Sequence, residues 1–572
     1  MLRFIYKTAF VEFFLLVVFT LLVWDFTEST ITGDGKGYYD YLPSTFIHQD
    51  IFRINDSAKE MTAFENRRSA LDFYLKYEEK WVNRYPCGTA VLQSPFFICT
   101  WLMSDTEGTF IDGYPKIYHR MVFFTALFYL LLSLVFLKKL LELYGAGRFT
   151  IFLSQILMIF ATSITQYASA NSAFSHVYSL FAITAFLFFT KEYFMDHRIR
   201  SFLVASVLLG LVVILRNING VILFFVPFLA GSWKNLGNGI LVILRKPLIL
   251  AIGLLLFFAL VFIQLFLWYA QTGHLLLYSY QGDGFNFLDP QFINILLSYR
   301  KGLFIYTPVL FLGIVGLVWL FLKRQYYFVS SWLVFFVLLT YLLSSWEWWY
   351  YGRSYGLRAY IDFYAIFFIP FAILFGQANR WGKGLLLISA LLTIPLNLIQ
   401  NYQYQNYIIH GTGMNKARYW KVFLKTHDSY KGLFFKQRID NSQYKVISEY
   451  EVGDITASPD IYTRVWTKHT SEIENFGSVK IIRIAFENEF KEENHCRLLL
   501  EIKDDEGKMI VYHRPYFIHF AGEKFNQFQK GMYNFELPKL DLPENQTVIF
   551  SVLADKNGTT LGNVRLQFLS TK

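Results

Sequence analysis

Long apolar runs recur along the chain, and they constrain its fold more strongly than any other feature of the sequence. A helix that crosses a bilayer needs about 20 predominantly apolar residues. The runs that approach or reach this length are 8–26, 118–137, 149–168, 173–190, 247–270, 303–322, 326–345, 359–377 and 384–400. A further run, 201–232, is interrupted by Arg216-Asn217-Ile218-Asn219-Gly220, and we interpret its halves as two short helices joined by a tight outer turn. The sequence therefore predicts a multi-span α-helical membrane protein with about eleven transmembrane helices.

The composition supports membrane helices and argues against two other classes of protein. Charged residues make up 17% of the chain and hydrophobic residues 54%, whereas soluble domains carry about 25% charged residues. The net charge of +10 does not indicate nucleic acid binding, because the basic residues are scattered at the ends of the apolar runs. No small-residue cleavage site follows the first run, so we interpret it as an uncleaved span and not as a signal peptide.

Lysines and arginines gather in alternate loops, which predicts the orientation of the chain. These residues are Arg3, Lys7, Lys138, Lys139, Arg148, Lys191, Arg198, Arg200, Lys234, Arg245, Lys246, Lys323, Arg324, Arg380 and Lys383. The positive-inside rule makes their side cytoplasmic, together with the N-terminus. The opposite side then receives the first outer loop, 27–117, and every residue after 401. The short apolar segment 88–103 would reverse this pattern if it crossed, so we interpret it as interfacial or re-entrant.

The composition changes after Gln400, which predicts a second domain. Residues 405–572 are richer in charge and lack long apolar runs. Alternating segments separated by turn signals begin at Lys480, Arg497, Lys508 and Thr547. Several short strands of this kind favour an all-β sandwich. We therefore expect a transmembrane domain over 1–404 and an extracytoplasmic β-sandwich over 405–572.

The polar clusters that stand out from the apolar background all fall on the predicted outer side. They are Gly33-Asp34-Gly35-Lys36-Gly37-Tyr38-Tyr39-Asp40-Tyr41, Arg84-Tyr85-Pro86-Cys87-Gly88, Asn171 with Ser175 and His176, Arg216-Asn217, the segment 298–308, and the segment 346–358. Three glycines around Asp34 and Lys36 can form a turn that aims a carboxylate back toward the membrane. A carboxylate held at the edge of the hydrocarbon is costly and is usually functional. This coincidence predicts an extracytoplasmic active site.

Transfer of a sugar from a phosphate leaving group matches the chemistry of these residues. A positioned carboxylate can take the proton of the acceptor hydroxyl as this oxygen attacks the anomeric carbon. We therefore assign Asp34, with Asp40 as a second acid, to catalysis. Cations must stabilise the departing phosphate, and arginine forks match its oxygens. The candidates for donor-phosphate binding are Arg216, Arg300, Lys301, Arg353 and Arg358, and those for substrate binding are Tyr38, Tyr85, His176 and Trp349.

Several of these residues can instead have a purely structural role. Asp34 is also a suitable N-cap for the helix that follows it, and Asp40 can pair with a nearby base. Arg353 and Arg358 can reach lipid headgroups as interfacial residues. His176 can be a satisfied polar residue at a helix end, and the aromatics around Trp349 can form an interfacial belt.

The motifs resemble those of the GT-C superfamily of integral membrane glycosyltransferases, which includes protein O-mannosyltransferases and lipid A aminoarabinose transferases. The resemblance covers roughly residues 5–400. Asp34 matches the acidic residue that family members carry soon after the first span. The matching segments are Tyr85–Phe97, Gly210–Asn217, Arg300–Pro308 and Trp349–Arg358. The chain departs from relatives with two adjacent acids, because Gly35 follows Asp34, so the second acid is either Asp40 or none.

The resemblance implies a polyprenyl-phosphate-sugar donor that enters from the outer leaflet, and inversion at the anomeric carbon. The acceptor would be an extracytoplasmic glycan, lipid or protein, and the location a bacterial inner membrane. Some relatives require a divalent cation, but no acidic cluster in this sequence demands one, and three scattered cysteines offer no ligand pair. The requirement for a divalent cation therefore stays open, and we assign no residue to metal binding.

Two other functions remain open from the sequence. A transporter or flippase of lipid-linked sugars would favour internal repeats and ionisable residues near the middle of the membrane. The charged residues noted above gather instead at the ends of the runs. A non-catalytic scaffold would place the function in 405–572 alone.

Overall fold

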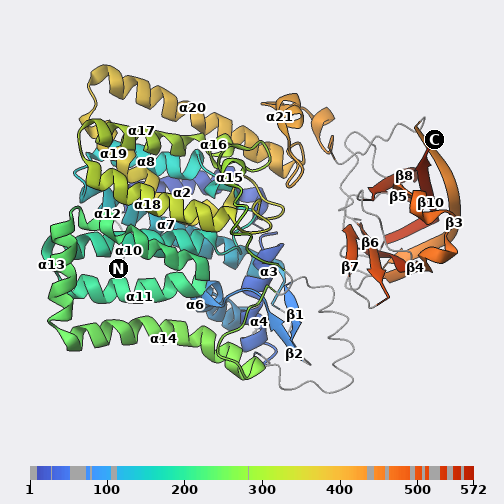
Figure 1. The fold of residues 1–572 in the computed structure, drawn as a ribbon, viewed down its shortest axis with the longest axis horizontal. Coiled ribbons are helices and arrows are strands. Elements are labelled where there is room, and N and C mark those ends of the chain that lie inside the picture. Colours follow the sequence, from blue (N-terminus) through green and yellow to red (C-terminus); the bar gives the residue numbers. More distant parts are fainter. Residues whose placement is uncertain are drawn as a thin grey trace. The chain divides into compact units, whose positions relative to one another are not determined.

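The computed structural model describes residues 9–27, 29–49, 51, 73–77, 80–104, 113–280, 283–434, 443–457, 463–489, 496–505, 509–513, 528–537, 545–554 and 559–572. The chain divides into two compact units. The first comprises Met1–Asp56, Phe73–Gln405 and Gly411–Leu424, and the second Ser57–Asp72, Asn406–His410 and Lys425–Lys572. Figure 1 shows that the first unit is mostly helical and that the second contains the C-terminal strands.

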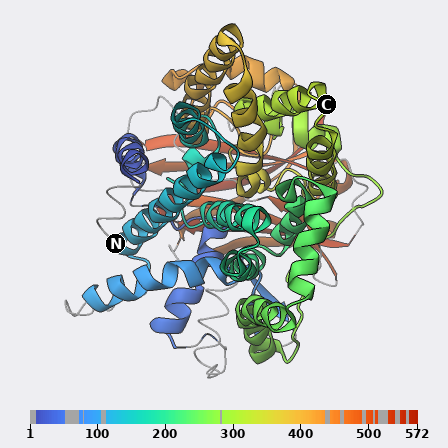
Figure 2. The same cartoon turned by 90° about the vertical axis from the view of Figure 1, so that its left-hand side faces the viewer.

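Five described helices are long and apolar enough to cross a membrane. They are α7 (Lys116–Glu142), α10 (His176–Asp196), α14 (Pro247–Thr272), α18 (Tyr326–Ser344) and α20 (Arg380–Gln405). Each coincides with one of the predicted runs. Figure 2, turned by 90°, shows several helices of the unit nearly end-on.

The other apolar helices are shorter, and the predicted number of about eleven spans is not confirmed. They are α2 (Phe10–Leu22), α6 (Gly88–Ser104), α8 (Arg148–Phe160), α11 (Ile199–Leu215), α17 (Phe311–Leu322) and α19 (Ala365–Gln377). By length and composition, the described chain holds five spans, or up to six if one bent pair counts as a single span. Several predicted runs are broken. For example, α16 (Leu303–Tyr306) ends just before Pro308, which lacks an N–H group and is the first residue of the 3-10 helix η4 (Pro308–Leu310).

The interrupted run 201–232 breaks where the sequence predicts. Helix α11 ends at Leu215, and Arg216 follows in an extended conformation. The chain continues through the 3-10 helix η3 (Asn217–Phe225) and α12 (Val226–Ala230). It then bends by 117° into α13 (Trp233–Leu244). The polar interruption therefore places Arg216 at a helix terminus, where its side chain is free to leave the helix surface.

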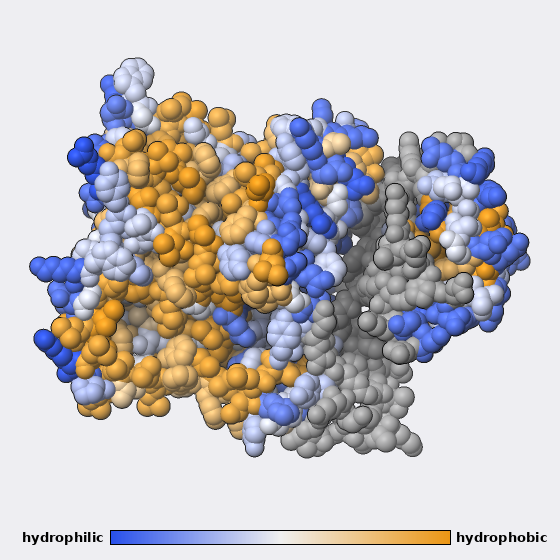
Figure 3. Space-filling model, in the orientation of Figure 1, coloured by the Kyte–Doolittle hydropathy of each residue, from blue (hydrophilic) through white to orange (hydrophobic). Residues whose placement is uncertain are grey.

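Apolar side chains cover much of the outer surface of the helical unit. Figure 3 shows a broad hydrophobic area over this unit. Helix α14 contributes Leu255 and Phe262, and α20 contributes Leu385 and Leu392, all of them exposed. A protein surface in water rarely exposes so large a contiguous apolar area. This surface is therefore expected to contact the lipid of a membrane.

The first outer loop folds against the helices through short elements. It contains α3 (Asp34–Tyr39), α4 (Tyr41–Phe46) and a hairpin of β1 (Tyr74–Tyr77) with β2 (Lys80–Asn83). Gly33 precedes α3 as its N-cap and has a φ of +52°, a conformation that favours glycine. Gly37 permits close packing of α3 against Tyr85, because a Cβ atom at this position would lie only 2.3 Å from Cδ2 of Tyr85. The glycines thus fix the entry and the packing of the helix that carries Asp34.

The C-terminal strands form two antiparallel four-stranded sheets. The first has the order β3 (Tyr444–Ala457), β10 (Thr559–Thr571), β5 (Ile481–Glu489) and β8 (Phe528–Glu536). The second has the order β4 (Thr463–His469), β9 (Gln546–Ala554), β6 (Cys496–Asp504) and β7 (Met509–His513). Buried residues from both sheets make one core, as in a sandwich. The four predicted strands are β5, β6, β7 and β9.

Candidate active site

The carboxylate of Asp34 forms an ion pair with Arg358. Nη1 of Arg358 lies 2.6 Å from Oδ2 of Asp34, with side-chain exposures of 15% and 30%. Gly33 is the N-cap of α3 and makes no side-chain cap, so Asp34 is the first residue of the helix and not its cap. Arg358 also lies over the ring of Phe174, 5.4 Å from the centroid. Arg358 is therefore largely buried and paired, which does not fit a headgroup contact.

A second buried carboxylate, Asp362, holds three side chains from distant parts of the sequence. Nη1 of Arg216 donates to its Oδ2 at 3.1 Å, and Nδ2 of Asn219 donates to the same oxygen at 2.8 Å. Nδ1 of His176 lies 2.7 Å from Oδ1. Asp362 has no exposed surface, whereas the Arg216 side chain retains 15%. Asp362 thus compensates the charge of Arg216 and fixes its direction.

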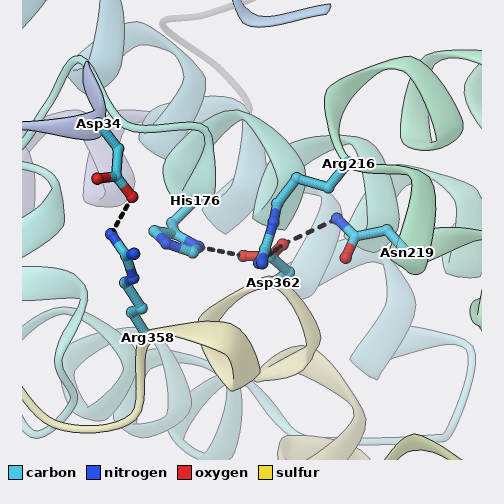
Figure 4. Close-up of polar contacts among 6 residues, drawn as sticks. All are labelled: Asp34, His176, Arg216, Asn219, Arg358 and Asp362. Atoms are coloured by element: carbon cyan, nitrogen blue, oxygen red, sulfur yellow. Dashed lines mark hydrogen bonds and ion pairs between the residues drawn. The ribbon is translucent and has the colours of Figure 1, made fainter. Parts of the chain in front are cut away.

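The 3-10 helix η5 (Arg358–Phe363) joins the two carboxylate clusters. It carries Arg358 at its first residue and Asp362 four residues later. Figure 4 shows the two clusters side by side, with Asp34 and Arg358 next to His176, Arg216 and Asn219. Phe174 lies between them, since its ring also stacks on that of His176 at 6.3 Å. Elements α3, α10, η3 and η5 together build one polar centre, which we call the two-arginine centre (Asp34, His176, Arg216, Asn219, Arg358 and Asp362).

Two predicted substrate-binding tyrosines line this centre. The rings of Tyr38 and Tyr85 lie 4.7 Å apart. Burial raises the pKa of the Tyr38 phenol, and the nearby Arg216 guanidinium lowers it in part. Burial also raises the pKa of Tyr85, and the Asp34 carboxylate raises it further. Both phenols are therefore neutral hydrogen-bonding groups near Asp34 at physiological pH.

Asp40 lies outside this centre, inside the first outer loop. Its Oδ1 accepts from the hydroxyl of Tyr114 at 2.9 Å, and its Oδ2 accepts from Ser44 at 3.1 Å and from Tyr74. The side chain is 9% exposed. These contacts favour the structural role considered for Asp40 over the catalytic one.

The remaining predicted cations form a second cluster. Nε of Arg300 donates to the Thr412 carbonyl at 2.8 Å, and the guanidinium lies 3.5 Å from the centroid of Tyr350 and 5.7 Å from that of Trp349. Lys301 is 2% exposed and bonds to the carbonyl and hydroxyl oxygens of Ser354. These contacts hold the outer loops together.

The surroundings of Lys301 in this second cluster disfavour the charged form of its side chain. Burial lowers the pKa of Lys301 well below its usual value, and repulsion from Arg358, Arg300 and Arg353 adds to the effect. Arg353 itself is exposed. Its side chain packs against Gly411, so closely that a Cβ atom on Gly411 would lie 2.5 Å from Cγ of Arg353. No described contact joins Arg300, Lys301, Arg353 or Trp349 to Asp34.

Sequence reasoning missed Asp362 and Asn219. Asp362 lies within the predicted run 359–377, so a carboxylate in an apolar run was the available signal. Asn219 belonged to the interruption after Arg216, but its side chain was not singled out. Among the described residues, no group of three or more His, Cys, Asp or Glu side chains could hold a metal ion.

Comparisons with known proteins give matches of structure but not of sequence. No protein-family model matches the chain, and no curated protein matches it. Solved structures that are similar include the oligosaccharyltransferase AglB from Archaeoglobus fulgidus in complex with an inhibitory peptide and a dolichol-phosphate, at 13% identity over 74% of this chain with a TM-score of 0.39. The apo form of the oligosaccharyltransferase from the same organism matches 73% of this chain at 13% identity, with a TM-score of 0.40. The arabinosyltransferase EmbB from Mycobacterium smegmatis matches 80% at 9% identity, with a TM-score of 0.29.

These neighbours are membrane glycosyltransferases of the GT-C superfamily. The present chain spans 60% of AglB, 58% of the apo oligosaccharyltransferase chain and 58% of EmbB.

Proposed function

We propose that this protein is a membrane glycosyltransferase that moves a sugar from a polyprenyl-phosphate donor to an acceptor outside the cytoplasm. Asp34 is the general base, and Arg216 and Arg358 bind the phosphate of the donor. The helical unit holds this site, at the outer face of a bacterial inner membrane. The N-terminus is cytoplasmic, and the C-terminal β unit is extracytoplasmic.

The two-arginine centre is the observation that carries this proposal. The side chains of Arg216 and Arg358 each make one ion pair, and neither guanidinium forms a hydrogen bond with another residue of the described part of the chain. A guanidinium has five N–H donors, so both arginines keep donors for a further oxyanion. Both are fixed by a carboxylate, which is the preorganisation that stabilisation of developing charge requires. Asp34 remains 30% exposed, so a substrate hydroxyl can approach it.

The chemistry of the step follows from this arrangement. The acceptor oxygen attacks the anomeric carbon, and Asp34 takes the hydroxyl proton as the new C–O bond forms. The bond between the anomeric carbon and the phosphate oxygen breaks, and the electron pair leaves with the lipid phosphate. The phosphate gains negative charge, which Arg216 and Arg358 stabilise. A single displacement of this kind inverts the anomeric configuration.

The other predicted residues take supporting roles in this scheme. Tyr38 and Tyr85 offer hydroxyl groups and ring faces to the sugar. His176 positions Asp362, which positions Arg216. The contacts of Arg300, Lys301 and Trp349 favour a role in holding the outer loops, and the hydroxyl partners of Asp40 favour a role in folding the first loop.

Replacement of Asp34 tests the proposal. Cells that lack the gene are complemented with the wild type, D34N or the control D25N, and their surface glycans are analysed by mass spectrometry. Asp25 is a matched control, because it is an exposed acid in the 3-10 helix η1 (Trp24–Phe26), just after α2. We expect D34N to lose one sugar residue from the surface glycans at unchanged protein level in the membrane, and D25N to retain it.

Two results would contradict the proposal. Normal glycosylation by D34N would remove Asp34 from its role as the base. Transport of labelled lipid-linked sugar in proteoliposomes, with no acceptor glycosylated, would identify a flippase instead.

A further inference from the structure

Arg84 differs from Arg216 and Arg358, because no acid of the described chain compensates its charge. Its main chain is fixed from two sides: its N–H donates to the Phe73 carbonyl at 2.8 Å, and its carbonyl accepts from Oγ of Ser279 at 2.7 Å. The first contact ties it to the β hairpin and the second to the loop after α14. Arg84 is therefore held at a defined place between two outer segments.

The side chain of Arg84 is poised for a ligand that the described chain does not supply. Its Nε is buried and has no hydrogen-bond partner among the described residues. The guanidinium lies over the ring of Tyr280, 5.7 Å from the centroid. Arg216 and Arg358 each have a carboxylate, whereas Arg84 forms no ion pair with the described chain. A buried guanidinium donor without a partner is rare and unfavourable, so an exogenous anion is its natural complement.

Tyr280 connects Arg84 to the proposed catalytic base. Its ring lies 5.5 Å from that of Trp346 and 6.4 Å from that of Tyr85. Tyr85 stacks on Tyr38, which is on the same short helix as Asp34. The nearby charge of Asp34 also contributes to the raised pKa of Tyr280. Arg84, Tyr280 and Tyr85 thus form a wall beside Asp34, which we call the Arg84 wall.

We propose that the Arg84 wall binds the carboxylate or phosphate group of an anionic sugar, at a subsite separate from the one that holds the lipid phosphate. Arg84 supplies charge-assisted hydrogen bonds, and Tyr280 fixes the plane of its guanidinium. The inference rests on the proposed glycosyl transfer, and it defines a substrate class: one reacting sugar carries a negative charge.

Binding of small probes to the purified full-length protein tests this subsite. Glucuronate and glucose 6-phosphate are the anionic probes, glucose is the neutral probe, and farnesyl phosphate reports on the lipid-phosphate site. We expect the wild type to bind at least one anionic probe about tenfold more tightly than glucose. R84Q should abolish this preference and leave farnesyl phosphate binding unchanged, whereas R84K should restore part of it. R120Q, which changes an exposed arginine of α7, should behave as the wild type.

The outcomes separate this inference from the proposed function. Loss of farnesyl phosphate binding in R84Q would overturn the separate subsite, because Arg84 would then be a third ligand of the donor phosphate. Equal binding of anionic and neutral sugars by the wild type would overturn it as well. A wild type that binds the anionic sugars but not farnesyl phosphate would contradict the proposed function and leave the Arg84 subsite supported. If R84Q and R84K fail to fold, Y280L provides a second test, since it removes the ring over which the guanidinium lies and should reduce the same preference.

Discussion

Asp362 is the residue on which the placement of Arg216 depends. Its two oxygens accept from three side chains that lie 143 to 186 positions away in the sequence. Burial of a single charge in such a place is strongly unfavourable, and a pair is tolerated when its hydrogen bonds are complete. The three partners of Asp362 together satisfy its two oxygens and compensate its charge, and Asp362 in turn directs Arg216.

Removal of the charge of Asp362 should destabilise the protein. D362N leaves Arg216 buried without its counter-charge, and breaking such a pair costs about 3–5 kcal/mol. We expect a clear fall in the thermal unfolding temperature of the purified protein, together with loss of transfer. D196N is the control, because it removes an exposed ion pair of similar length, 2.8 Å, with Arg198. If D362N unfolds at the temperature of the wild type, Asp362 does not hold Arg216.

The sequence predicted the residues of the two-arginine centre unevenly, for physical reasons. Asp34 and Arg216 stood out because each interrupts an apolar context at the end of a helix, where a charge needs an explanation. Asp362 did not stand out, because aromatic and aliphatic neighbours surround it in the run 359–377. Its partners depend on tertiary packing between α10, η3 and η5, and no local pattern encodes such pairings.

At the scale of elements, α3 places Asp34 by close packing. Gly35 and Gly37 lie where Cβ atoms would meet Ala173 at 2.7 Å and Tyr85 at 2.3 Å. The helix has only six residues, so its position depends on these contacts more than on its own hydrogen bonds.

Filling the space beside Gly37 should therefore displace Asp34, the proposed base. G37A adds a methyl group into the ring of Tyr85, and overpacking of this kind costs about 1–3 kcal/mol. We expect reduced transfer and reduced thermal stability. G237A is the matched control, since nothing lies within 4 Å of a Cβ atom at Gly237 in α13, and alanine there should stabilise the helix by up to about 1 kcal/mol. Equal activity of both variants would show that the position of α3 is not critical.

Five of the predicted helices are confirmed as long apolar helices, whereas the predicted number of spans is not confirmed where local chemistry shortens an apolar run. Helices α7, α10, α14, α18 and α20 follow from their length. Pro308 and the 3-10 helix η5 shorten two other predicted runs, and a count based on hydropathy does not register such breaks.

At the scale of the whole molecule, each unit has its own hydrophobic core. The core of the helical unit and that of the β unit contain different residues. In the β unit, β5, β6, β9 and β10 contribute alternate side chains such as Ile484, Leu500, Phe550 and Leu566. The sequence predicted four of its strands from alternation, whereas charged residues obscured the alternation in β3.

The β unit should fold by itself and lack transfer activity. A fragment comprising residues 443–572 contains all eight strands and their shared core. We expect a β-type circular dichroism spectrum and cooperative thermal unfolding from the purified fragment. We expect no transfer, because the two-arginine centre lies in the helical unit. A fragment that restores the surface glycan in cells lacking the gene would support the non-catalytic scaffold instead.

The ion pair between Asp34 and Arg358 also has a consequence for the proposed catalytic cycle. After one turnover, Asp34 would hold a proton and lose its attraction for Arg358, just as the departing lipid phosphate acquires a second negative charge. The guanidinium of Arg358 would then bind the released lipid phosphate more strongly than it binds Asp34. Regeneration therefore requires that the proton escape to water through the exposed edge of Asp34, so that the carboxylate competes again for Arg358 and the carrier is expelled.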